Sequence, residues 1–176
     1  MEIRPVADHD MAAIQAIYAH HVLNGLASWE LEPPDVAELT VRRNGLLSAG
    51  YPFVVAILDG ELVGYASAGP YRTRPAYRFT VENTIYLHPH RPGQGIAQPL
   101  LQRVIDDCTA LGFRQMIAVV GDSGNHPSIR FHEKMGFCRV GLIENIGWKA
   151  GRWLDSVILQ RALGPGGGVP PKESGN

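Results

Sequence analysis

The spacing of apolar residues along the chain alternates between a period typical of helices and one typical of strands. Some segments repeat apolar residues every three or four positions, and others are short runs rich in β-branched and aromatic residues. The predicted strands are 1–6, 52–58, 61–69, 79–88, 115–120, 137–148 and 151–163, and the predicted helices are 11–22, 36–49, 97–111 and 126–135. The resulting order, β-α-α-β-β-β-α-β-α-β-β, predicts a mixed α/β domain around one central sheet.

Residues with special backbone preferences mark several ends of these elements. Asp59-Gly60, between two strand-like runs, predicts a two-residue hairpin. Pro127 favours the first turn of a helix. Asp8 or Asp10 is expected to cap the first helix, because a carboxylate there accepts hydrogen bonds from unpaired backbone N–H groups.

The size of the chain indicates one globular domain. It has 176 residues, of which 45% are hydrophobic and 19% are charged, as in ordinary soluble proteins. We assign residues 1–163 to a single domain. The last segment, 164–176, reads GPGGGVPPKESGN and has little to bury, so we expect it to be disordered.

Charge and composition argue against several classes of partner. The formal net charge is −1, so no overall field favours nucleic acid or acidic membranes. No apolar run approaches the roughly 20 residues that span a bilayer, and the N-terminus lacks the apolar core of a signal peptide. We therefore expect a cytoplasmic protein without nucleic-acid or membrane partners. His88 and His90 lack a neighbouring carboxylate or cysteine cluster, so no metal is expected.

The segment IYLHPHRPGQGIAQPLL, residues 85–101, passes from strand to helix across Gly93, Gly95 and Ala97. A helix N-terminus presents unpaired N–H groups at the positive end of the helix dipole, and glycines let a ligand approach them. The turn is therefore a candidate phosphate site, with Arg91 as a charge partner. Alternatively, the glycines only shape the turn. Neither the dinucleotide fingerprint nor the P-loop motif is complete here.

This strand, the R-x-G-x-G-x-A turn and the following helix resemble motif A of the GNAT superfamily of N-acetyltransferases. In that family, Q/R-x-x-G-x-G/A holds the pyrophosphate of acetyl-CoA. Gly95 and Ala97 match its small residues, whereas Pro92 stands where Gln or Arg is usual. NHPSIRFHEKMGF, residues 125–137, resembles a later helix of the family. Together with TVENTIYLHPHRPGQGIA, GYASAGPYR and GRWLD, it makes the chain similar to the phosphinothricin and methionine sulfoximine acetyltransferase branch.

The resemblance implies a GNAT fold, with a mostly antiparallel sheet flanked by about four helices. It also implies acetyl-CoA as co-substrate, a homodimer and a role in detoxification. The residues that it implies for acetyl-CoA binding are Ile85, Tyr86, Leu87, Arg91, Gly93, Gln94, Gly95, Ile96, Ala97, Gln98, Asn125 and Ser128.

Acetyl transfer to an amine requires a base, because alkyl ammonium groups titrate near ~10. Glu82 is the candidate base, at the position that the branch resemblance gives to its proposed base. Strand alternation puts Glu82 on one face with Thr84 and Tyr86; alternatively, it is an exposed strand glutamate. His132 stands where many GNAT enzymes carry a tyrosine that protonates the departing thiolate. A histidine can donate a proton near neutral pH, or it only packs below the cofactor.

The loop PYRTRPAYR, residues 70–78, carries the candidates for binding an anionic substrate. Arginine forks match carboxylates and phosphinates, which makes Arg72, Arg74 and Arg78, with Tyr77, plausible substrate contacts. The alternative is a solvated basic loop. Trp29 either forms a wall of the substrate pocket or belongs to the core.

The predicted function is transfer of acetyl from acetyl-CoA to the α-amino group of a small amino acid analogue. Phosphinothricin, methionine sulfoximine and methionine sulfone are the candidates, attacked directly in a ternary complex with Glu82 as base. Two alternatives are a GNAT enzyme that acetylates a protein N-terminus or lysine, and a non-catalytic acyl-CoA-binding protein. The loop arginines argue against a cationic peptide substrate.

Overall fold

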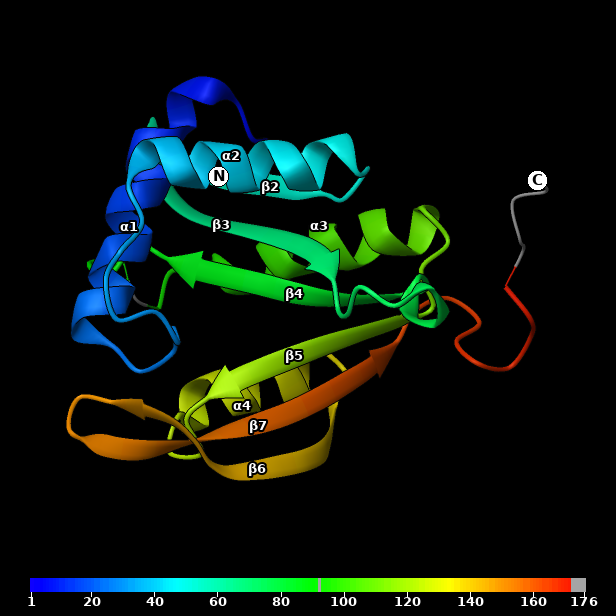
Figure 1. Cartoon of the computed structure of the whole chain (residues 1–176). Helices are drawn as coiled ribbons and strands as arrows, with labels where there is room; N and C mark the ends of the chain where they lie inside the picture. Colours follow the sequence, from blue (N-terminus) through cyan, green and yellow to red (C-terminus); the bar gives the residue numbers. More distant parts are fainter. Residues whose placement is uncertain (92, 172–176) are drawn as a thin grey trace.

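The computed structural model describes residues 1–91 and 93–171, and its elements follow the predicted order (Figure 1). The strands are β1 (Glu2–Pro5), β2 (Phe53–Leu58), β3 (Glu61–Pro70), β4 (Thr80–Leu87), β5 (Gln115–Gly121), β6 (Cys138–Lys149) and β7 (Arg152–Ala162). The helices are α1 (Met11–Asn24), α2 (Val36–Ser48), α3 (Ala97–Ala110) and α4 (His126–Lys134), with short 3-10 turns at Asp8–Asp10 and Pro75–Tyr77.

The strands form one sheet in the order β1-β2-β3-β4-β5-β7-β6. Only the β4–β5 pair among these neighbours is parallel, which confirms the mixed α/β class and the mostly antiparallel sheet. The predicted hairpin at Asp59-Gly60 is present, with φ of 52° and 81° at its two turn residues. Both angles are left-handed, as in the tight turns whose twist matches that of the flanking strands.

Helices cover both faces of the sheet (Figure 1). The larger apolar core lies on the face covered by α3 and α4, where Leu100, Leu101 and Leu159 are fully buried. A smaller cluster lies under α1 and α2 and includes Ile14 and Val55. Residues of β2, β3 and β4 alternate between these two clusters, as period-two patterning requires.

The strands β4 and β5 separate part-way along the sheet, as their spreading ribbons in Figure 1 show. Their pairing covers only Thr80–Glu82 of β4, which face Gln115–Ile117 of β5. Beyond this point β4 stays paired with β3 to Leu87, and β5 stays paired with β7 to Gly121. Two unpaired strand edges therefore face each other in the middle of the molecule.

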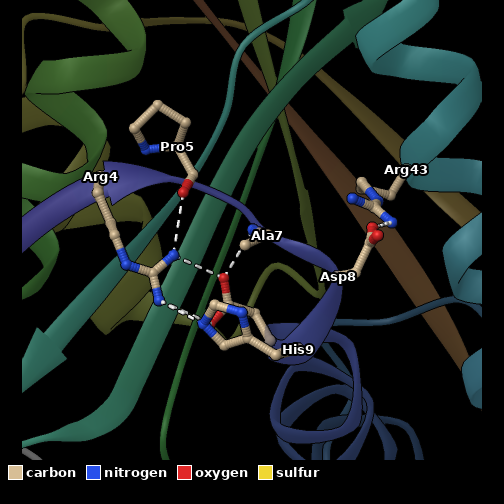
Figure 2. Close-up of polar contacts among 7 residues, drawn as sticks. Arg4, Pro5, Ala7, Asp8, His9 and Arg43 are labelled. Atoms are coloured by element: carbon tan, nitrogen blue, oxygen red, sulfur yellow. Dashed lines mark hydrogen bonds and ion pairs between the residues drawn. The ribbon is translucent and has the colours of Figure 1, made fainter.

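The start of α1 differs from its predicted cap (Figure 2). Asp10 precedes the helix but makes no side-chain cap. Its carboxylate instead accepts hydrogen bonds from Arg4 at 2.7 and 2.8 Å and from the amide of Ala7 at 2.8 Å. Asp8 pairs with Arg43 of α2. The prediction that Asp8 or Asp10 caps α1 itself is wrong: Asp8 pairs with Arg43, and Asp10, besides pairing with Arg4, caps the preceding 3-10 turn through the amide of Ala7.

The C-terminal segment begins directly after β7. The amide of Leu163 donates to the carbonyl of Arg114 at 3.0 Å, and turns cover residues 164–167. The Arg114 guanidinium donates to the carbonyl of Pro170 at 3.3 Å. Residues 172–176 lie outside the described part of the chain. The domain boundary at residue 163 and the disorder of 164–176 therefore stay predictions.

Candidate active site

A cavity of about 250 Å³ lies where β4 and β5 separate. It crosses the sheet, because its walls come from both helical layers. The α1 side contributes Tyr18 and the connection to α2, and the opposite side contributes the start and first turns of α4. The described lining residues are Tyr18, Ala27, Ser28, Trp29, Glu30, Glu82, Asn83, Thr84, Ile85, Tyr86, Ala118, Val119, Val120, Gly121, Asn125, Ser128 and His132.

Glu82 is the last residue of β4 that pairs with β5. Its side chain lies on the face covered by α1 and α2. Thr84 and Tyr86 share this face, as the strand alternation predicts, and the Tyr86 ring packs against Tyr18 of α1 at 5.1 Å between centroids. The neighbour of Glu82 on β3 is Gly69, which has no side chain to cover it, and its neighbour on β5 is Ile117. Burial raises the pKa of the Glu82 carboxyl above its usual value. The carboxylate is therefore a stronger base than an exposed glutamate.

His132 lies in α4 on the other side of the cavity and is 4% exposed. Its Nδ1 is 2.9 Å from the carbonyl of Ser128, and its Nε2 is 3.2 Å from the amide nitrogen of Asn83. A carbonyl only accepts, so Nδ1 of His132 carries a proton and donates it to Ser128. Burial also lowers the pKa of His132. The proton-donor role of His132 and its packing alternative both stay predictions.

Asn125 is the N-cap of α4. Its side-chain oxygen accepts from the amide of Ser128 at 3.3 Å, and its side-chain nitrogen donates to the carbonyl of Gly121 at 3.2 Å. The residue thus ties the end of β5 to the start of α4, with Pro127 in the first helical turn as predicted. This bond fixes the wall of the cavity that Ser128 and His132 also line.

The turn between β4 and α3 supplies unpaired donors. Gly93 and Gly95 have φ of 75° and 70°, and a Cβ at either position would meet no atom within 4 Å. The first amides of a helix have no intrahelical acceptor, and the first amide of α3 that donates a hydrogen bond among the described residues is that of Leu100, to the carbonyl of Ile96 at 3.3 Å. Pro99 has no N–H to satisfy. These orphan donors and the open space before them fit a phosphate group.

Comparison with known proteins identifies the family. The profile of the Acetyltransferase (GNAT) family matches residues 14–137. The chain belongs to the GNAT family of acetyltransferases. It is 47% identical over 170 residues to the phosphinothricin N-acetyltransferase of Alcaligenes faecalis, covering 97% of this chain and 86% of the relative. It is 37% identical over 163 residues to the L-methionine sulfoximine/L-methionine sulfone acetyltransferase of Salmonella typhimurium, covering 93% and 95%.

A solved GNAT structure superimposes closely on this fold. It is a phosphinothricin acetyltransferase from Sinorhizobium meliloti in complex with acetyl-CoA, with a TM-score of 0.95 and 44% sequence identity. The alignment covers 98% of this chain and 94% of that one. The family and branch resemblance of the sequence is thereby confirmed, and the protein is an acetyltransferase.

Other predicted contacts of this GNAT enzyme are placed differently. Arg91 forms an ion pair with Glu61 of β3, so its guanidinium is not free in this structure. Pro92, the departure from motif A, lies outside the described residues. Ile85 lines the cavity, whereas Leu87 packs against the larger core. The binding roles of these residues stay predictions.

The loop arginines precede β4, at the end of the strand where β4 still pairs with β5. Arg72 stacks over Tyr71 and Tyr77, at 5.2 and 6.0 Å to the ring centroids, and the Arg78 guanidinium lies over Phe79 at 4.6 Å. The described lining of the cavity includes none of Arg72, Arg74, Tyr77 and Arg78. Trp29, in contrast, does line it.

Sequence reasoning missed two features of the site. One is Asn83, a buried polar residue whose side-chain oxygen has no hydrogen-bond partner in the described chain; an asparagine in an apolar strand was its only signal. The other is a polar network in which the Tyr18 hydroxyl contacts Ser28 at 3.0 Å and donates to Glu30 at 3.1 Å. Arg42 of α2 donates to the same carboxylate.

Two further findings concern the described residues as a whole. No group of three or more His, Cys, Asp or Glu side chains among them lies arranged to hold a metal ion. In the same part of the chain, no helix is both long and apolar enough to cross a membrane.

Proposed function

We propose that the protein transfers acetyl from acetyl-CoA to the α-amino group of a small amino acid analogue of the phosphinothricin, methionine sulfoximine or methionine sulfone type. The observation that carries this proposal is the cavity through the sheet, with Glu82 on one side and α4 on the other. Relatives named for acetylating these compounds, at 47% and 37% identity, support the substrate class.

Acetyl-CoA fits the residues of the turn and the cavity. The backbone of the turn and the first amides of α3 would hold its pyrophosphate, and the separated edges of β4 and β5 offer free backbone groups to its pantetheine arm. Leu87 and its neighbours would direct the thioester toward the cavity. Asn125 and Ser128 would line the α4 side of this path.

The amine then attacks the thioester carbonyl directly. A C–N bond forms, the C–S bond breaks, and coenzyme A leaves as a thiolate. Glu82 accepts a proton from the amine, directly or through one water, because its raised pKa makes it the better base. The α-carbon chain of the acceptor would lie beside Trp29. The thiolate takes its proton from His132 or from solvent.

We also propose a cytoplasmic homodimer with a role in detoxification. The edge strand β6 and its partner β7 expose large apolar side chains, which a second copy would cover. These residues are Val140, Leu142, Ile143, Ile146, Trp148 and Trp153. In one chain the loop arginines do not line the cavity, so we propose that they bind the anionic acceptor in the site of the second subunit.

The deciding experiment is acetyl-CoA-dependent thiol release by the purified protein. The acceptors are methionine sulfoximine, methionine sulfone, phosphinothricin, free amino acids and a lysine peptide. Saturable turnover with the analogues and none with the peptide is expected. Turnover with the peptide alone would establish the protein-acetylating alternative instead. A Glu82→Gln variant should retain acetyl-CoA binding and lose turnover, whereas acetyl-CoA binding without turnover in the wild type would indicate a non-catalytic protein.

A further inference from the structure

Trp29 rests on two positions that have no side chain. A Cβ at Gly147 of β6 would lie 2.1 Å from Cζ3 and 2.5 Å from Cε3 of the indole. A Cβ at Gly121, at the end of β5, would lie 3.2 Å from Cε2 and Cζ2. Neither glycine has a positive φ, so the backbone conformation admits other residues. The indole is what requires glycine at position 147.

The residues beside Trp29 are fixed to the body of the protein. The buried Lys149 donates from Nζ to the carbonyl of Ser28 at 2.8 Å. The Ser28 hydroxyl contacts Tyr18 at 3.0 Å and accepts from the amide of Glu30 at 3.2 Å. Because these bonds hold the backbone on both sides, a side chain at position 147 must turn the ring rather than move the loop.

The ring forms a wall in only one half of the site. Trp29 lines the cavity together with Tyr18 and Glu82, on the side where the amine is proposed to enter. The turn before α3, residues 93–98, is not part of this lining. A change in ring position should therefore affect the acceptor and leave acetyl-CoA binding unchanged.

We propose that Gly147 is a specificity-determining position that acts through Trp29. The missing side chain lets the indole lie against β6, which holds open the space for the carbon chain of a small amino acid acceptor. Gly147 touches neither substrate and is a positioning residue. This inference rests on the proposed function and names a determinant of its acceptor range.

Gly147→Ala tests the inference, with Gly141→Ala as the matched control. Gly141 lies on the same strand, and a Cβ there would meet no atom within 4 Å. Gly147→Ala is expected to raise KM for the acceptor about tenfold, because a change of one methyl group in pocket volume discriminates between substrates by about this factor. The increase should be largest for acceptors with the longest side chains. KM for acetyl-CoA should stay within about twofold in both variants, because neither substitution touches a residue proposed to bind acetyl-CoA.

The double variant Trp29→Ala/Gly147→Ala separates this effect from general damage. It removes the clash, so it should fold at least as well as Gly147→Ala and acetylate as well as Trp29→Ala alone. Effects that add in the double variant, or a Gly147→Ala enzyme indistinguishable from Gly141→Ala, would overturn the inference.

An additional readout does not depend on activity. Gly147→Ala should change the tryptophan emission, and the same change should be absent in a Trp29→Phe background. Unchanged emission in Gly147→Ala would contradict the close packing of the Trp29 ring against Gly147. A wild-type protein that acetylates no amino acid would overturn the proposed function and the acceptor role together, while the emission comparison would still report whether the ring rests on Gly147.

Discussion

Single residues show how burial alone prepares Glu82 for its proposed role. Burial raises its pKa, and a base works only when ionised, so activity is lost as the pH falls through this raised value. The acidic limb of kcat/KM against pH should lie above the ~4.3 of an ordinary glutamate. Steady-state rates from acidic to neutral pH measure it. A limb at or below the ordinary value, or one that persists in the residual rate of Glu82→Gln, would contradict this assignment.

For His132, burial shifts the pKa in the opposite direction from that of Glu82. Burial lowers its pKa, so below about 6.5 the unfolded chain binds a proton that the folded protein does not. The free energy of unfolding should therefore fall as the pH falls from this value toward the lower folded pKa. Urea unfolding at several pH values should show that the free energy of unfolding depends less on pH in His132→Phe than in the wild type. His126→Gln, which removes an exposed histidine at the start of the same helix, should leave the slope nearly unchanged.

Among the elements, the turn between β4 and α3 combines strain with open space. Gly95 has φ of 70°, so alanine there costs about 1 kcal/mol of backbone strain and also fills space that the pyrophosphate would occupy. Gly112, just beyond the other end of α3, has φ of 88° and equally open surroundings. Both alanine variants should lose similar stability by thermal unfolding. Only Gly95→Ala should weaken acetyl-CoA binding in calorimetry, by roughly tenfold or more, and equal losses in both would assign the effect to strain.

The elements themselves were largely predictable from the sequence, because periodicity and turn residues act locally. The strand and helix order, the Asp59-Gly60 hairpin and Pro127 at the start of α4 follow from neighbouring residues alone. The cavity depends on where β4 and β5 part, which no local pattern encodes. The packing of Trp29 against Gly121 and Gly147 joins residues far apart in the chain, so no local pattern predicts it either. For Arg72, residue type indicated what the side chain can bind but not where its loop lies.

For the whole molecule, the exposed apolar residues of the edge strand β6 predict that two copies associate. β6 pairs with β7 on one side, and the rest of the described chain leaves its other edge uncovered. Exposed edges with large apolar residues promote association. Leu142 of β6 is 51% exposed and Trp148 is 57% exposed, and the Trp148 ring meets Trp153 of β7 at 5.3 Å. We therefore expect the wild type to elute as a dimer in size-exclusion chromatography with light scattering.

A single charge on this edge should separate the subunits. Leu142→Arg would place an unpaired guanidinium in the apolar interface, where desolvation costs several kcal/mol, enough to dissociate a moderately stable dimer. Leu111→Arg is the matched control, because Leu111 is similarly exposed, at 56%, but follows α3 away from β6. Leu142→Arg should yield monomers and Leu111→Arg should not. If the monomeric variant also loses affinity for anionic acceptors but not for acetyl-CoA, the second subunit contributes to the acceptor site, as proposed for the loop arginines.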